Sequence, residues 1–148
     1  MSSALFFLAG VIQERAKTRE LGALGGLLRP MPLYGSATAL AFFASLGLPG
    51  LAQFPAELQI FLGTFDVYPA IAAVAVLGIV ITAGLFLLAL QRAFLGETPE
   101  RWRLLPDLDR RELVVLGSLL AFVVALGVYP RLALDLISAA SWLGSQGP

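Results

Sequence analysis

The sequence contains no cysteine and no histidine. Without cysteine, the chain can form neither a disulfide nor a thiolate metal site. Without histidine, it lacks the commonest transition-metal ligand and the side chain that titrates nearest to neutral pH. These absences argue against a zinc hydrolase, a haem protein and an enzyme that relies on a histidine-activated nucleophile. Glycine-rich phosphate-binding motifs are also absent, so nothing supports nucleotide binding.

Charged residues are scarce as well. They make up 14% of the 148 residues, whereas hydrophobic residues make up 58%. Soluble domains contain about 25% charged and roughly 45–50% apolar residues. The composition therefore predicts a membrane protein, and the long apolar stretches along the chain predict that it is all-α and polytopic. The basic residues flank apolar stretches and lack an aromatic stacking platform, so we do not expect a nucleic-acid partner.

Nine of the ten basic residues fall into two short segments. The first contains Arg15, Lys17, Arg19 and Arg29, and the second contains Arg92, Arg101, Arg103, Arg110 and Arg111. The positive-inside rule places loops 13–31 and 92–111 in the cytoplasm and the C-terminus outside. The arginines are most simply topology determinants, with contact to a partner subunit or to anionic membrane lipid as the alternative.

The apolar stretches predict half of one transmembrane helix and three full spans. Residues 1–12 form the partial helix, because Ala4–Ile12 covers only about 14 Å of a roughly 30 Å hydrocarbon core. The chain therefore resembles a fragment or one piece of a split subunit. The full spans are residues 32–65, 67–91 and 112–130, and residues 131–148 form an interfacial tail.

The second span, residues 32–65, has to be discontinuous. As one helix it would be about 50 Å long, well beyond the thickness of a bilayer. We expect Pro49 and Gly50 to end its first arm and Pro55 to be the first helical residue of the second arm. A helix break in hydrocarbon is tolerated only where protein or a water-filled cavity surrounds it.

Glu57 is the only charged residue between Met31 and Phe65. An ionisable side chain at bilayer depth is costly and marks an ion path more often than a packing site. We therefore predict that Glu57 transfers protons, with a purely structural hydrogen-bonding role as the alternative. Gln53 and Gln59 flank this acid and are candidates to line a hydrated path. Their alternative role is to pair with backbone groups freed at the break.

The chain resembles the C-terminal part of the antiporter-like M-type subunits of respiratory complex I, the proton-pumping NADH:quinone oxidoreductase, and of their mitochondrial and photosynthetic relatives. The resemblance covers essentially the whole sequence in order. It rests on Leu5–Gly10, Glu14-Arg15, Thr18-Arg19, Gly25-Gly26-Leu27, Ser45–Gly50, Glu57, Gln91–Gly96, Arg111-Glu112-Leu113 and Gly127–Pro130.

This resemblance implies helices 11–14 of a fourteen-helix antiporter-like fold, in which Glu57 is the proton-transferring acid of the broken helix twelve. It also implies that the chain itself binds no cofactor and no metal. NADH or another donor, FMN, iron–sulfur clusters and quinone would belong to partner subunits. Expected partners are membrane lipid, the L-type and N-type neighbouring subunits, and a chain or segment supplying helices 1–11.

Residue 56 departs from the pattern of these subunits. The family usually has glycine before the acid, where this chain has Ala56 preceded by Pro55.

The resemblance implies a bacterial inner membrane, or a thylakoid membrane for a photosynthetic relative. The alternatives are the D subunit of an Mrp-type Na⁺/H⁺ antiporter or a relative from a membrane-bound hydrogenase. A structural membrane scaffold, in which Glu57 only holds helices together, is a second alternative.

Overall fold

The computed structural model describes residues 1–18, 20–131 and 135, and within these residues the chain is helical without strands. The helices are α1 (Ser2–Ala16), α2 (Pro32–Ser45), α3 (Gln53–Val67), α4 (Pro69–Phe94) and α5 (Arg110–Val128), with a short 3₁₀ turn η1 (Glu100–Trp102). The predicted all-α architecture is confirmed, with α2 and α3 as the two arms of the discontinuous span. The predicted interfacial tail lies almost wholly outside the described residues.

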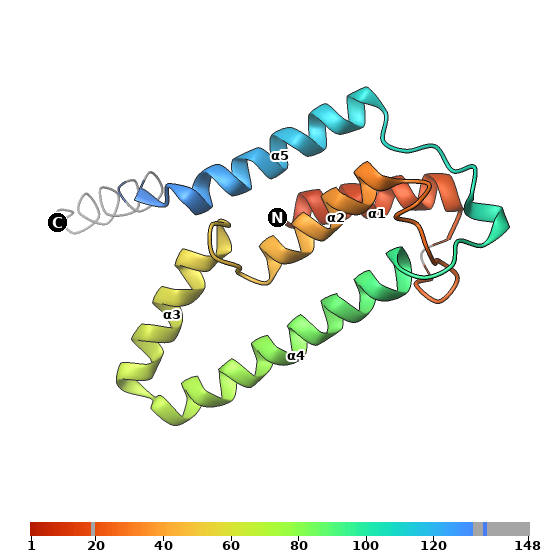
Figure 1. Ribbon diagram of the computed structural model, residues 1–148. Coiled ribbons are helices and arrows are strands. Elements are labelled where there is room, and N and C mark those ends of the chain that lie inside the picture. The colour runs from red at the N-terminus through yellow and green to blue at the C-terminus, as the bar shows by residue number, and fades with distance from the viewer. Residues whose placement is uncertain (19, 132–134, 136–148) are drawn as a thin grey trace.

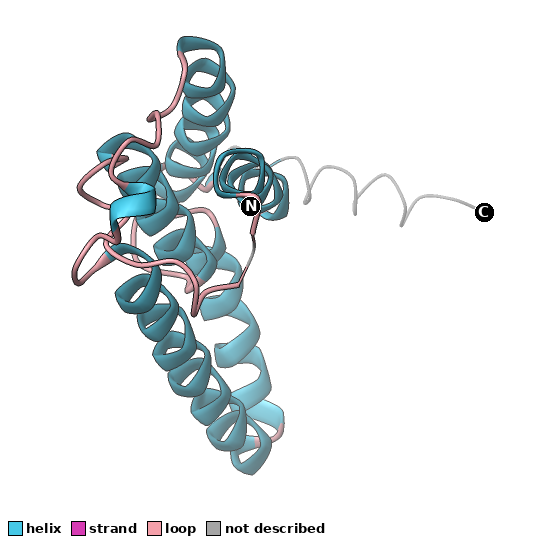
Figure 2. Ribbon diagram, turned by 90° about the vertical axis from the view of Figure 1, so that its right-hand side faces the viewer, coloured by secondary structure: helices cyan, strands magenta, loops and turns pink. Residues whose placement is uncertain are grey.

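Helices α1, α2 and α5 lie alongside one another, and α3 and α4 meet in a sharp turn at Tyr68 (Figure 1). The loop that follows α1 and the loop between α4 and α5 lie at the same end of the molecule, whereas the α3–α4 turn lies at the other end (Figures 1 and 2). The two arginine-rich loops therefore share one end. The largest fully buried side chains cluster near it: Leu8, Leu27, Met31 and Leu116.

Helix α4 is strongly apolar but almost unburied. Its most apolar 18-residue window has a mean hydropathy of 2.8, and 6% of that window is buried. Among the described residues, α4 and α5 are the two helices long and apolar enough to span a membrane. Large side chains such as Val74, Leu77, Ile81 and Leu85 are at least 60% exposed. An apolar surface of this extent is stable only against lipid or other helices. The structure is thus that of a polytopic membrane protein.

The two arginine-rich loops are joined by backbone hydrogen bonds. The N–H groups of Leu27 and Leu28 donate to the carbonyls of Ala93 and Phe94, each at 3.2 Å. Carbonyls at a helix C-terminus have no partner within the helix, so this loop satisfies the end of α4. Gly26 makes the close approach possible, because it has a φ of +59° and an added Cβ would lie 2.6 Å from the hydroxyl oxygen of Thr98.

A network of charges ties the same end together. Asp107 accepts hydrogen bonds from the N–H groups of Leu33 (2.9 Å) and Tyr34 (3.0 Å), which are first-turn amides of α2. Arg15 of α1 donates to the Asp107 carbonyl at 3.1 Å and pairs with Glu112 of α5 at 2.5 Å. Glu112 also accepts the Asp109 N–H at 2.8 Å, so Asp109 and Glu112 form a capping box at the start of α5.

We expect Glu112→Ala to destabilise the packing of α1 against α5. The pair is largely buried, with 13% of the Arg15 side chain and 22% of the Glu112 side chain exposed. Removal of Glu112 leaves a largely buried guanidinium without its carboxylate, at a cost of about 1–3 kcal/mol. The melting temperature of the purified assembly measures this loss. Glu100→Ala is the matched control, because its 3.9 Å pair with Arg103 is exposed. Equal melting temperatures for both variants would contradict a structural role for the Arg15–Glu112 pair.

Candidate functional site

The predicted helix break is present, but it begins earlier than expected. Helix α2 ends at Ser45, so the prediction that Pro49 and Gly50 end the first arm is wrong. The end is set by Gly47, whose φ is +64°. The Gly47 N–H donates to the Ala44 carbonyl at 3.4 Å and the Leu48 N–H donates to the Phe43 carbonyl at 3.3 Å, which together form a Schellman motif. Pro49 then follows where a helix cannot resume.

The second arm also begins earlier than expected. Helix α3 starts at Gln53, so the prediction that Pro55 is its first residue is wrong by two positions. Pro55 still lies in the first turn, where backbone N–H groups have no partner within the helix and a missing N–H costs nothing. Gly50, with a φ of +89°, completes the turn between the two arms. Pro49, Gly50 and Pro55 therefore shape the break without marking its exact limits.

Glu57 lies in the second turn of α3 and is half-buried. Its Oε1 accepts a hydrogen bond from the side-chain amide of Gln53, one turn earlier, at 3.0 Å. Gln59 is exposed, and two residues along a helix it points away from Glu57. The structure thus brings one of the two candidate glutamines to the acid and leaves the other apart. Within the described residues Glu57 forms no ion pair.

The other carboxylate oxygen lies against the backbone of the break. A Cβ added to Gly47 would overlap Oε2 of Glu57, so only glycine leaves room for the acid in this position. Gly47 therefore has two functions, because it ends α2 and it also provides the space for the carboxylate. Gly47 was not among the predicted site residues. The glycine–apolar–proline order of Gly47-Leu48-Pro49 is the signal that identifies such a helix end.

Glu57 also lines a pocket of about 260 Å³ between the break and α4. The other lining residues are Ser45 and Leu46 at the end of α2, and Ala75, Gly78, Ile79 and Thr82 of α4. The volume is enough for several water molecules, each of which occupies about 30 Å³ in the liquid. The Thr82 hydroxyl donates to the Gly78 carbonyl at 2.9 Å, and its oxygen can still accept a hydrogen bond. The acid therefore faces a cavity that can hold water.

Helix α5 supports the break from another direction. A Cβ on Gly127 would overlap the backbone of Gly50 and Leu51, so α5 packs directly on the connecting segment. Leu51 is buried there in a small cluster with Ala44 and Val123. This contact was not predicted, because a lone glycine in an apolar helix does not reveal which segment it meets.

No group of three potential metal-ligating side chains occurs among the described residues.

A discontinuous membrane helix with an acid at the break and a pocket large enough for water beside it is an arrangement typical of ion-translocating membrane proteins. Residues 1–82 match the family described as "NADH:quinone oxidoreductase/Mrp antiporter, TM", and the chain belongs to this family. The match includes α1, both arms of the broken helix and the first half of α4.

Over 145 residues the chain is 40% identical to NADH-quinone oxidoreductase subunit M of Pseudomonas aeruginosa. This match covers 98% of this chain and 28% of the relative. It resembles a chain of respiratory complex I from Thermus thermophilus, with a TM-score of 0.81 and 33% identity over 85% of this chain and 26% of that one. The Mrp complex of Dietzia shares the fold, with a TM-score of 0.70 and 23% identity over 90% of this chain and 33% of that chain. The chain thus spans about a quarter of the length of its complex I relatives.

Proposed function

We propose that the chain is part of a proton-translocating, antiporter-like subunit of NADH:quinone oxidoreductase. The observation that carries this proposal is the position of Glu57, an acid held at a helix break and open to a cavity of about 260 Å³. The similarity to subunit M supports the choice of complex. Substrate oxidation and quinone reduction would occur in other subunits, and this chain would contribute one proton-transferring residue to the translocation pathway.

In this mechanism Glu57 alternately accepts and releases a proton. Gln53 fixes the orientation of the carboxylate through its 3.0 Å hydrogen bond, and Gly47 leaves Oε2 unobstructed by a side chain. Water in the pocket would carry the proton to and from the acid, with the hydroxyl oxygen of Thr82 as an acceptor along the pocket wall. The proposed charged partner of Glu57 is a lysine of another segment or subunit, because the only lysine of this sequence, Lys17, lies at the C-terminal end of α1.

The same proposal covers topology and partners. Loops 13–31 and 92–111 share one end of the structure, which supports a cytoplasmic location for both and a bacterial plasma membrane as the site of action. L-type and N-type subunits would be the neighbours within the membrane. We propose that the chain binds no cofactor, and that flavin, iron–sulfur clusters and quinone are held by partner subunits.

A subunit of an Mrp-type cation/proton antiporter remains the second candidate, because the Mrp complex has the same fold. Affinity purification of the intact assembly from native membranes separates the two functions. A complex I subunit is expected to co-purify with iron–sulfur and quinone-binding subunits and with quinone reductase activity. Co-purification with other antiporter subunits alone, together with sodium-dependent proton exchange, would contradict the complex I assignment.

A further inference from the structure

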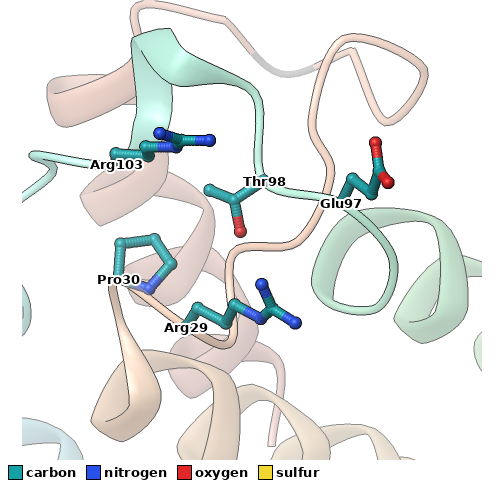
Figure 3. Close-up of a pocket in the computed structure, with 5 residues that line it drawn as sticks. All are labelled: Arg29, Pro30, Glu97, Thr98 and Arg103. Atoms are coloured by element: carbon teal, nitrogen blue, oxygen red, sulfur yellow. The ribbon is translucent and has the colours of Figure 1, made fainter.

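A polar pocket of about 490 Å³ lies at the end of the molecule where the two arginine-rich loops meet. Its lining residues are Arg29 and Pro30 before α2, and Glu97, Thr98 and Arg103 after α4 (Figure 3). In this view the Arg103 guanidinium extends towards the segment that carries Thr98, and the Glu97 carboxylate points away from both arginines. The proton-translocation mechanism uses none of these residues.

The two guanidinium groups are available to a ligand. Arg29 forms no ion pair with any of the described residues, and Arg103 has only a 3.9 Å contact with the exposed Glu100. Such an exposed pair contributes little free energy. The wall between them is fixed, because the Thr98 hydroxyl donates to the Gly26 carbonyl at 2.8 Å. The pocket therefore presents two cations on a backbone that its own hydrogen bonds hold in place.

The location of the pocket points to the membrane surface. Arg29 lies three residues before α2 begins, and Glu97 lies three residues after α4, a candidate membrane span, ends. Residues at span ends lie at the depth of the lipid headgroups. Two leucines close in sequence to the lining residues are exposed, with Leu95 55% exposed and Leu104 95% exposed. A ligand that is both anionic and apolar suits this combination better than a small soluble anion.

We propose that this pocket binds the phosphate group of an anionic phospholipid. The guanidinium groups of Arg29 and Arg103 donate to the phosphate oxygens, a pairing to which the planar guanidinium is well suited. Leu95 and Leu104 contact the glycerol and the upper acyl chains. Two arginines and one glutamate leave a net charge of +1, which balances the single charge of a phosphodiester. Inorganic phosphate carries a larger charge at neutral pH and lacks an apolar part.

Native mass spectrometry of the intact membrane assembly in detergent tests this proposal. Phosphatidylglycerol is titrated as the anionic probe, phosphatidylcholine as the zwitterionic probe, and inorganic phosphate as the competitor. The test variant is Arg29→Gln combined with Arg103→Gln. The matched control is Arg110→Gln combined with Arg111→Gln, which removes two exposed charges from the same end of the molecule but outside the pocket. Both double variants are expected to assemble normally, because all four substituted arginines are exposed.

The test variant is expected to lose roughly tenfold or more in affinity for phosphatidylglycerol, whereas the control keeps affinity close to that of the unmodified protein. Arg29→Lys combined with Arg103→Lys should retain part of the binding, because the charge remains. Equal losses in the test and control variants would overturn the proposal by showing a general effect of surface charge. Displacement of the lipid by millimolar inorganic phosphate, or equal binding of phosphatidylcholine, would also overturn it.

Discussion

Glu57→Gln in the intact assembly is expected to lower proton translocation through this subunit by at least roughly tenfold. Glutamine has nearly the same shape and can still accept the hydrogen bond from Gln53, so the break is preserved. Its amide cannot take up and release a proton near neutral pH, which removes the proposed step. Proton uptake into proteoliposomes, recorded together with quinone reduction, measures the effect.

The control for this variant is Asp66→Asn. Asp66 also lies on α3 but is exposed near the α3–α4 turn, away from the break and its pocket. Its replacement removes one negative charge from the same helix and is expected to leave translocation unchanged. If Glu57→Gln assembles normally and pumps as well as Asp66→Asn, Glu57 has only a structural role. The scaffold hypothesis would then be favoured.

Gly47→Ala is expected to have the second largest effect. The alanine would have to adopt a φ of +64°, which costs about 1–2 kcal/mol, and its Cβ would overlap the Glu57 carboxylate. We therefore expect the acid to move, with a several-fold loss of translocation as well as a lower melting temperature. Both are measured on the same purified assembly.

Gly50→Ala separates these two consequences. Gly50 has a φ of +89°, yet a Cβ at this position meets no atom within 4 Å. The Gly50 variant is thus expected to lose stability through backbone strain and to retain more translocation than the Gly47 variant. If both variants lose translocation equally, the break is simply sensitive to strain, and the close approach of Gly47 to Glu57 has no functional importance.

The architecture and the acid were predictable because they depend on local features of the sequence. Long uncharged runs between arginine-rich segments predict membrane helices whatever surrounds them. A single carboxylate among apolar residues, close to Pro49, Gly50 and Pro55, predicts both a break and a functional side chain. Gln53 was a candidate only because it flanks the acid, as Gln59 does. Its position one turn before Glu57 follows from the start of α3 at Gln53, which the sequence did not indicate.

The remaining features depend on contacts between distant segments. Asp107 caps α2 from 74 residues away, and nothing in either segment alone indicates that pairing. The positions of the helix ends at the break were missed because Gly47 satisfies the last carbonyls of α2 before the prolines are reached. Pro55 fits anywhere in a first turn, so its presence locates the start of a helix only to within a few residues.

Infrared difference spectroscopy of the intact assembly, comparing resting and turning-over states, is the most direct test of the proton-carrier role of Glu57. Labelling glutamate with ¹³C identifies bands that arise from glutamate carboxyl groups. We predict a protonated-carboxyl band that changes on turnover, shifts with the label and disappears in Glu57→Gln. An unchanged difference spectrum in Glu57→Gln would contradict the proposal that this acid exchanges a proton during the reaction.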